Sequence, residues 1–357
     1  MIMKIAVLSR SRAPLGTSAG AEAVKFKKLY PEEDYKGRDD IKDALSIFEA
    51  LKELGYKVEL LNGEYEIFSI PERKFNIVFN VCDDGFRNDP LLEPHIPALL
   101  DIFNIPYTGN NYLTLGWRLN KARVKQYFCF HKIPTPKFQV FRTKKDKLSP
   151  ELKFPLFVKP VHEDASIGIR QDSLCKNRKE LKKKINYILE NYNEGALVEE
   201  FIKGREFNVA VVGNEEPIAL PVSEIDFSQL PKELAPIVTY NAKWDEDSIE
   251  YKKTPPVCPA KIGKRTEKLL KEMAIKCYKI LGCRGYARVD FRFSDSKPYV
   301  LEVNANPDIS PGAGLANAAK AHGWSYKEFI KRILDYGLEA HKKRNNQFEV
   351  GKQIKKS

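Results

Sequence analysis

Residues Leu281–Gly314 read LGCRGYARVDFRFSDSKPYVLEVNANPDISPGAG, and the interpretation of the whole chain starts from this stretch. Its pattern predicts two short strands, Gly285–Phe293 and Tyr299–Asn304, joined by a turn over Ser294–Pro298. Successive side chains of a strand point to opposite faces. The polar residues of each strand are therefore expected on one face, and Leu301 and Val303 on the other.

The polar face of this predicted hairpin carries groups that can hold a metal ion. Arg288 and Asp290 share a face of the first strand, and Glu302 and Asn304 share a face of the second. If these faces pair, they bring together hard oxygen ligands of the kind that Mg²⁺ takes alongside phosphate oxygens. The alternative is a half-solvated strand pair whose polar face meets water. The loop 305–314, rich in proline and glycine, favours a functional site at the strand end.

The composition indicates a large folded protein. The chain has 357 residues, of which 43% are hydrophobic and 30% charged, a balance typical of soluble proteins with two or three domains. It contains no run of about eighteen apolar residues, and its start, MIMKIAVLSRS, indicates a first strand rather than a signal peptide. The six cysteines lack Cys-x-x-Cys spacing, which favours reduced thiols in a cytoplasmic protein over disulfides or a zinc site.

The formal net charge of +12 is compatible with two kinds of partner, anionic small molecules such as ATP and nucleic acids. Lysines concentrate in the segments 176–184, 261–279 and 341–357. The first two segments contain apolar residues at helical spacing, so solvated helix faces explain them, and the third is expected to be a frayed basic tail. No aromatic-basic pattern or zinc finger supports nucleic-acid binding. We therefore expect small-molecule substrates, with no nucleic-acid and no membrane partner.

The first third of the chain predicts a small parallel α/β domain. Apolar strands alternate with amphipathic helices, with strands at Lys4–Leu8, Lys57–Leu61 and Lys74–Val81 and helices at 41–54 and Leu91–Phe103. The loops 9–18 and 83–89 follow two of these strands, and we expect them to face a ligand together.

The middle of the chain places charged side chains at the ends of predicted strands. Strands are predicted at Lys137–Phe141, Leu156–Lys159 and Ala196–Phe201, and helices at Leu119–Cys129, Arg178–Tyr192, Gly263–Leu281 and Ser325–Leu338. Lys159 precedes a loop of small residues, which suits a point charge on phosphates beneath a flap; a strand-end lysine that reaches solvent is the alternative. Glu199, Glu200 and Glu206 lie near a turn at Gly204, where one could bind a ribose or all could be exposed.

Residues 223–256 show few periodic signals. Such a long loop in a compact domain is usually a functional lid or a disordered segment. Lys243 lies within it, where it could close over a bound phosphate.

A series of motifs then occurs in order: Phe157-Val-Lys-Pro, Glu163-Asp-Ala-Ser-Ile-Gly, Leu197-Val-Glu-Glu-Phe, Gly204-Arg-Glu-Phe, Tyr240-Asn-Ala-Lys, Gly282-Cys-Arg-Gly-Tyr-Ala-Arg-Val-Asp and Leu301-Glu-Val-Asn-Ala-Asn-Pro. This series resembles the ATP-grasp superfamily, most closely its D-alanine–D-alanine ligase branch, and spans roughly two thirds of the chain from Lys121 onward. The resemblance implies an α/β protein with a three-domain ATP-grasp fold. Its parts would be an N-terminal parallel α/β substrate-binding domain (1–115), a central subdomain (116–202), a C-terminal catalytic subdomain (203–340) and a basic tail (341–357).

The resemblance also implies roles for individual residues. The ATP phosphates would be held by Lys121 and Lys159, with Ser166 and Gly168 in the covering loop and Lys243 reaching the transferred phosphate. The adenine and its surroundings would meet Glu199, Glu200 and Ile202, and the ribose would meet Glu206. Two Mg²⁺ ions, or Mn²⁺ in their place, would be bound by Asp290, Glu302 and Asn304. The catalytic residues would be Arg288, Lys243 and Ser166.

The implied reaction forms an amide or peptide bond. Magnesium and lysines spread the charge of the γ-phosphoryl group while a substrate carboxylate attacks it. An amine then attacks the acylphosphate, Arg288 stabilises the oxyanion, and ADP and phosphate leave. Water must be kept from the acylphosphate, which gives the segment 223–256 a reason to close.

Three segments differ from the usual pattern of D-alanine–D-alanine ligases. Residues 9–20 read SRSRAPLGTSAG instead of a Gly-Gly-x-Ser-x-Glu signature, residues 81–89 read VCDDGFRND instead of His-Gly-x-x-Gly-Glu-Asp-Gly, and Asp308-Ile-Ser replaces Gly-Met-Thr. All three contact the amino-acid substrates in the family. The substrates therefore stay open between D-alanine, other amino acids and a small peptide or natural product. A non-catalytic nucleotide-binding regulator is a further alternative, and the resemblance suggests a homodimer.

Overall fold

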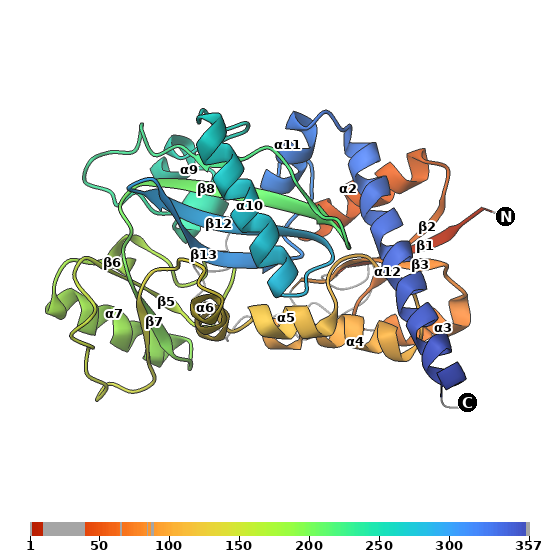
Figure 1. The fold of residues 1–357 in the computed structure, drawn as a ribbon, viewed down its shortest axis with the longest axis horizontal. Coiled ribbons are helices and arrows are strands. Elements are labelled where there is room, and N and C mark those ends of the chain that lie inside the picture. Colours follow the sequence, from red (N-terminus) through yellow and green to blue (C-terminus); the bar gives the residue numbers. More distant parts are fainter. Residues whose placement is uncertain (1, 10–39, 65, 84, 87–88, 355–357) are drawn as a thin grey trace.

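The computed structural model describes residues 2–9, 40–64, 66–83, 85–86 and 89–354, whose strands form three sheets flanked by helices (Figure 1). The strands are β1 Lys4–Ser9, β2 Lys57–Asn62, β3 Ile77–Val81, β4 Phe138–Phe141, β5 Leu156–Pro160, β6 Leu174–Cys175, β7 Ala196–Glu200, β8 Arg205–Gly213, β9 Ile218–Ala219, β10 Ser223–Ile225, β11 Pro256–Val257, β12 Gly285–Ser294 and β13 Lys297–Ala305. The helices are α2 Asp40–Glu53, α3 Ile70–Arg73, α4 His95–Ile102, α5 Tyr112–Arg118, α6 Lys121–Phe130, α7 Arg178–Asn191, α8 Tyr240–Trp244, α9 Ile249–Lys253, α10 Lys264–Ile280, α11 Gly314–Ala321 and α12 Tyr326–Ile354. Short 3₁₀ turns lie at Ile67–Ser69, Pro90–Leu92 and Gln171–Ser173.

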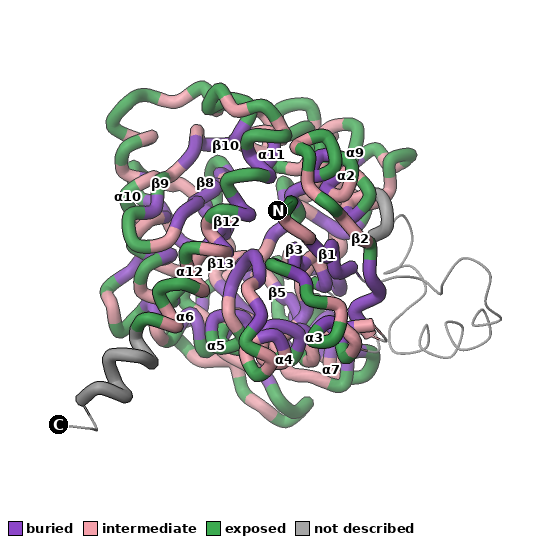
Figure 2. Tube along the Cα trace, turned by 90° about the vertical axis from the view of Figure 1, so that its right-hand side faces the viewer, coloured by how far each residue is buried: buried purple, intermediate pink, exposed green. Residues whose placement is uncertain are grey.

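The N-terminal sheet is parallel, with strand order β2-β1-β3, as the sequence predicts. Alternate residues of β1 pack into two different cores. Ile5 and Val7 face α2 and the C-terminal helix α12, whereas Ala6 and Leu8 face α4. Burial on both sides explains why β1 is a continuous apolar run rather than an alternating one. Figure 2 shows that most residues of β1 and β3 are buried, whereas the helices around them carry exposed residues.

The central sheet has strand order β4-β7-β5-β6 and is antiparallel, and α7 packs on it. The third sheet runs β11-β10-β8-β12-β13, with β9 paired to β8. In Figure 1, α10 lies across this sheet. Its residues Leu270 and Tyr278 pack with Val289 and Phe291 of β12, so this face of the hairpin is apolar and buried.

The hairpin β12–β13 is confirmed, with one difference in register. Arg288 pairs with Asn304 and Asp290 with Glu302, but a bulge follows, and Phe291 then pairs with Val300. The alternation predicted Leu301 on the apolar face with Val303, and this prediction is wrong. Because a bulge changes the parity of a strand, Val300 and Val303 both pack in the core, whereas Leu301 is half-buried near Glu302.

The segment 223–256 is not a structureless loop. It contains β10, α8, α9 and the start of β11. The two helices begin at serine or threonine caps: Thr239 Oγ1 accepts a hydrogen bond from Ala242 N at 3.1 Å, and Ser248 Oγ accepts one from Tyr251 N at 3.0 Å. Each helix has five residues, which is too short for a hydrophobic period to be visible.

The last helix also differs from the prediction, because α12 continues from Tyr326 to Ile354, into the tail that was predicted to be frayed. Gly337 lies inside it, where an added Cβ would be 2.8 Å from the Tyr107 carbonyl oxygen. This glycine therefore permits close packing and does not end the helix. Helix α11 was not predicted. Within the described part of the chain, no helix combines the length and the apolar character needed to span a membrane.

Candidate active site

The polar face of β12–β13 forms one hydrogen-bonded cluster. Arg288 Nε and Nη2 donate to the two carboxylate oxygens of Asp290, each at 2.7 Å. Asn304 Nδ2 donates to Asp290 Oδ2 at 2.9 Å and to Glu302 Oε1 at 3.3 Å. Asn208 of the neighbouring strand β8 donates to Asp290 Oδ1 at 2.7 Å. The structure thus brings together the four hairpin residues that side-chain alternation predicted to meet.

Two buried lysines face this cluster from the other side. Lys159, at the end of β5, is 5% exposed, and its Nζ lies 4.0 Å from Glu302 Oε2. The alternative of a lysine reaching solvent is therefore wrong for Lys159. Lys121 begins α6, and its buried Nζ donates to the Glu163 carbonyl and lies 3.6 Å from Asp164 Oδ1. Carboxylates on one sheet and lysines beside another form the kind of arrangement that can position a charged phosphate chain.

The charges of this region shift one another's pKa values. Burial acts to raise the pKa of Glu302, but Lys159, Lys121 and Arg288 outweigh burial and lower that pKa to about 2. Burial lowers the pKa of Lys121 to about 8, although Glu302 opposes the shift. Burial also acts to lower the pKa of Lys159, but Glu199 and Glu302 outweigh it, and the pKa is raised. Glu302 and Lys159 are therefore charged near neutral pH, whereas Lys121 loses its proton more readily than an exposed lysine.

The surroundings of Glu199 differ from those expected of a residue that only contacts adenine. It is 2% exposed and bridges two lysines: Lys125 Nζ lies 2.5 Å from its Oε1, and Lys159 Nζ lies 3.1 Å from its Oε2. Lys125 was not singled out in the sequence. It lies one helical turn after Lys121 on α6, and this spacing is the signal that could have found it.

The remaining predicted nucleotide contacts lie at the start of β8 and just before it. Glu206 is buried and paired with Arg292 at 2.8 Å, and burial raises the pKa of Glu206 despite that partner. Glu200 Oε1 accepts a hydrogen bond from Lys153 N at 3.1 Å, and Ile202 is half-buried. Arg292 was not predicted, although it continues the alternation of Arg288 and Asp290 along β12.

The loop that carries Ser166 and Gly168 is attached to the segment 223–256. Ser166 Oγ donates to the Val238 carbonyl at 3.2 Å, and Trp244 Nε1 donates to the Ala165 carbonyl at 2.9 Å. Ser166 and Gly168 both have left-handed backbones, with φ of 63° and 75°. Lys243 Nζ lies 5.1 Å from the centre of the Trp244 ring. The two segments are therefore attached to each other and form one cover, and Lys159 pairs with Glu302 of the hairpin.

The oxygen atoms on the hairpin suit a metal ion that also binds phosphate oxygens and water, rather than one held entirely by protein side chains. Among the described residues, no group of three or more His, Cys, Asp or Glu side chains is placed to hold a metal ion. Asp290, Glu302 and Asn304 supply two carboxylates and an amide oxygen. This set suits Mg²⁺, which commonly takes one or two carboxylates and completes its shell with phosphate oxygens and water.

The three sheets, with buried lysines facing a carboxylate-bearing hairpin, define an ATP-grasp enzyme. The fold is similar to that of the Bacillus anthracis D-alanine–D-alanine ligase crystallised with ATP, with a TM-score of 0.70 and 21% identity, covering 96% of this chain and 99% of that one. It is also similar to the D-alanine–D-alanine ligase of Coxiella burnetii, with a TM-score of 0.70 and 18% identity, covering 100% of this chain and 99% of that one.

Sequence comparisons identify the family within this class. The model for the D-ala D-ala ligase C-terminus matches residues 129–335. The D-alanine–D-alanine ligase of Carboxydothermus hydrogenoformans is 32% identical over 84% of this chain and 93% of that protein. An uncharacterized protein, y4sG, of Sinorhizobium fredii is 34% identical over 81% of this chain and 85% of that protein. The chain belongs to the D-alanine–D-alanine ligase family, and it is an ATP-dependent ligase that forms carbon–nitrogen bonds.

Proposed function

We propose that this enzyme joins the carboxyl group of one amino acid to the amine of a second amino acid or small peptide. ATP would first phosphorylate the carboxylate, and the amine would displace phosphate from the acylphosphate. The observation that supports this best is the polar face of β12–β13, where Arg288, Asp290 and Glu302 lie opposite the buried Lys159.

The proposed roles follow from charge and position. Lys121 and Lys159 neutralise the ATP phosphates, and Arg288 stabilises the oxyanion formed when the amine attacks. Asp290, Glu302 and Asn304 would hold two Mg²⁺ ions, or Mn²⁺, which supply positive charge to the transferred phosphoryl group. No protein nucleophile is required, because the substrate carboxylate is itself the attacking group.

The remaining residues would bind the nucleotide and cover it. Ser166, Gly168 and Lys243 belong to the cover over the phosphates. The adenine and its surroundings would meet Glu199, Glu200 and Ile202, and the ribose hydroxyls would bind Glu206, which pairs with Arg292. Closure of this cover would exclude water from the acylphosphate.

D-alanine is the first substrate to test, because several relatives are named D-alanine–D-alanine ligases. The decisive experiment measures ADP and phosphate release from ATP and Mg²⁺ with D- and L-amino acids, singly and in pairs. Release with D-alanine alone assigns a D-alanyl ligase activity. Release that requires another pair assigns a different peptide ligase. No release with any substrate, despite ATP binding, contradicts the proposal and favours a nucleotide-binding regulator.

Three further features are part of the proposal. The protein would act in the cytoplasm, as a homodimer, on small molecules and without nucleic acid. Light scattering in solution tests the dimer, and a monomeric mass for the active enzyme contradicts it. The expected absence of a nucleic-acid partner is tested by measuring binding to duplex and single-stranded DNA across a salt series, because charge-driven binding weakens steeply with salt.

A further inference from the structure

A buried carboxylate lies inside the cover, which consists of the loop 163–171 and the segment 223–256. Glu250, on the short helix α9, is 9% exposed. Within the described part of the chain, no lysine or arginine forms an ion pair with Glu250. Burying a carboxylate is unfavourable unless the group is paired or hydrogen-bonded. Hydrogen bonds must therefore satisfy the carboxylate of Glu250.

These hydrogen bonds come from two other segments of the cover. Glu250 Oε1 accepts one from Gln171 Nε2 at 3.1 Å and one from Thr239 Oγ1 at 3.2 Å. Gln171 lies at the end of the loop that carries Ser166 and Gly168, and it begins a 3₁₀ turn. Thr239 is 2% exposed and is the N-cap of α8. A single carboxylate oxygen on α9 therefore joins α8 to the phosphate-covering loop.

The direction of each hydrogen bond in this network is fixed by a backbone amide. Gln171 Oε1 accepts from Ala235 N at 2.7 Å, and Thr239 Oγ1 accepts from Ala242 N at 3.1 Å. A backbone N–H can only donate, so the Gln171 side-chain nitrogen and the Thr239 hydroxyl hydrogen remain to donate to Glu250. Both chains of hydrogen bonds therefore end at the carboxylate. Hydrogen bonds in such chains polarise and strengthen one another.

The position of Lys243 depends on this network. Lys243 lies in α8, a helix of five residues that begins at the Thr239 cap. A helix this short is not stable by itself, so contacts with its neighbours decide where it lies. Glu250 holds the cap at the start of α8, and at its end Trp244 Nε1 donates to the Ala165 carbonyl at 2.9 Å. Lys243 lies between these two attachments, so both contribute to its orientation.

We propose that Glu250 is a positioning residue, whose carboxylate ties α8 to the phosphate-covering loop and so fixes Lys243 over the transferred phosphate. This inference rests on the proposed ligase function, in which Lys243 reaches that phosphate, and it adds a residue that acts through Lys243. Lys121 and Lys159 begin α6 and end β5, outside the cover, and they hold the ATP phosphates without Glu250. The loss of Glu250 should therefore slow the transfer step more than it weakens ATP binding.

The test measures ADP formation in a single turnover by rapid quench, which separates phosphoryl transfer from product release. The substrates are ATP, Mg²⁺ and an amino-acid pair that supports ADP release. Glu250→Ala should lower the rate by about tenfold or more, because a misplacement of about 1 Å can cost about 100-fold. The KM for ATP should change by less than about threefold. Glu250→Gln keeps an oxygen that can accept both hydrogen bonds, so it should restore most of the rate.

A double variant tests whether Glu250 acts through Lys243. Lys243→Met should slow ADP formation, and adding Glu250→Ala should slow it no further, because the group that Glu250 positions is already gone. A general structural defect would instead add its own loss, so additive losses overturn the inference. A wild-type rate in Glu250→Ala also overturns it. Glu246→Ala is the matched control: Glu246 is exposed between α8 and α9, so the rate should not change.

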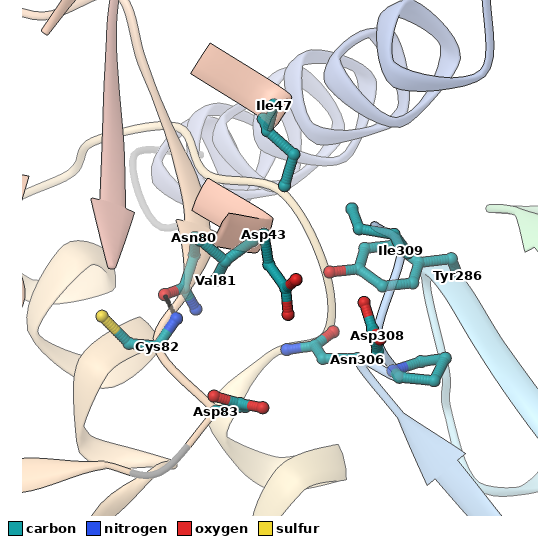
Figure 3. A pocket seen from close by; sticks show the side chains of 11 residues that line it. Asp43, Ile47, Asn80, Val81, Cys82, Asp83, Tyr286, Asn306, Asp308 and Ile309 are labelled. Carbon is teal, nitrogen blue, oxygen red and sulfur yellow. Dashed lines mark hydrogen bonds between the residues drawn. The ribbon is translucent and has the colours of Figure 1, made fainter. Parts of the chain in front are cut away.

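The amino-acid side of the site provides a further control. Figure 3 shows a hollow where the N-terminal sheet meets the end of the hairpin. Its wall includes Asp83 and Asp308, which belong to the segments that contact the amino-acid substrates in the family. These residues follow β3 and β13 and are not part of the cover. Glu250→Ala should therefore change the KM of each amino acid by less than about threefold, and a rise as large as the loss of rate overturns the inference.

Hydrogen exchange of the free protein separates this inference from the proposed function, because it requires no substrate. The amides of Ala235 and Ala242 donate into the network. Glu250→Ala should speed their exchange by about tenfold, as expected when hydrogen bonds to a charged group are lost, and Glu246→Ala should leave it unchanged. If no amino-acid pair supports ADP release, the proposed function fails, and this exchange decides the inference. Faster exchange in Glu250→Ala then supports the tie, and equal exchange overturns it.

Discussion

Replacing Glu199 by glutamine should strongly destabilise the protein. Glu199 is 2% exposed and neutralises Lys125 and Lys159, which are 1% and 5% exposed. Removing one partner of a buried ion pair typically costs about 3–5 kcal/mol, because the other charge is left in a medium of low polarity. In the variant, Lys159 still has Glu302 at 4.0 Å, and Lys125 keeps Thr135 Oγ1 at 2.7 Å. We therefore expect a loss near the lower end, about 3 kcal/mol.

Urea unfolding followed by circular dichroism measures this loss, and a second substitution tests its cause. Adding Lys125→Met to Glu199→Gln removes the lysine left without a carboxylate, so the double variant should regain at least about 1 kcal/mol. A cost below about 1 kcal/mol for Glu199→Gln at neutral pH would refute a buried charge network.

The same substitution should change the pH dependence of stability. Burial acts to raise the pKa of Glu199, but Lys125 and Lys159 outweigh burial and lower it. A lowered carboxyl pKa stabilises the folded state above the usual value of 4.5, and this contribution is lost as the pH falls toward the folded pKa. The difference in unfolding free energy between wild type and Glu199→Gln should therefore shrink in acid. A difference that stays constant from neutral pH into acid contradicts the charge argument.

Three further predictions concern the metal site, the nucleotide and a helix cap. Asp290→Asn and Glu302→Gln should each lower ADP release on the order of 100-fold while a fluorescent nucleotide still binds, if both carboxylates hold the metal ions of the proposed phosphoryl transfer. Undiminished turnover contradicts the metal assignment. The KM for ATP should rise as the pH passes about 8, where Lys121 loses its charge, and a KM that stays flat through this range opposes that role. Asn177→Ala should cost about 1 kcal/mol in urea unfolding, because the Asn177 side chain caps α7 through hydrogen bonds from Lys179 N and Glu180 N. An unchanged midpoint would show that the cap contributes little.

The parts of the site that were predictable depend on local rules. Side-chain alternation identified Arg288, Asp290, Glu302 and Asn304 as one cluster, because residues two apart on a strand share a face whatever the rest of the fold does. The parallel order of the N-terminal sheet followed from its alternating strands and helices. Local patterns are sufficient where the contacts are close in sequence.

The parts that were missed depend on contacts between distant segments. Lys125 meets Glu199 only because α6 packs beside the central sheet, and Asp43 approaches Asp308 only because α2 packs near the hairpin end. Neither of these two contacts is indicated by the residues nearby in the sequence. The predicted substrate loop at 10–18 lies outside the described residues. The helices of the segment 223–256 were missed for another reason. Each has only five residues, too few to show a hydrophobic period, and its start is marked only by one capping side chain.

The bulge in β13 connects the core to the chemistry. Without it, the residues opposite Phe291 and Arg292 would be Leu301 and Val300, and Val300 would be on the same face as Glu302. With it, Val300 and Val303 both enter the core beneath α10, and Glu302 still faces Lys159 and pairs with Asp290. The core therefore fixes the orientation of the face that carries Asp290 and Glu302, on one side of the bulge. On this same side of the bulge, Asp290, Arg288 and Tyr286 stay in continuous register with β8, so the alternation of β12 is unbroken between them.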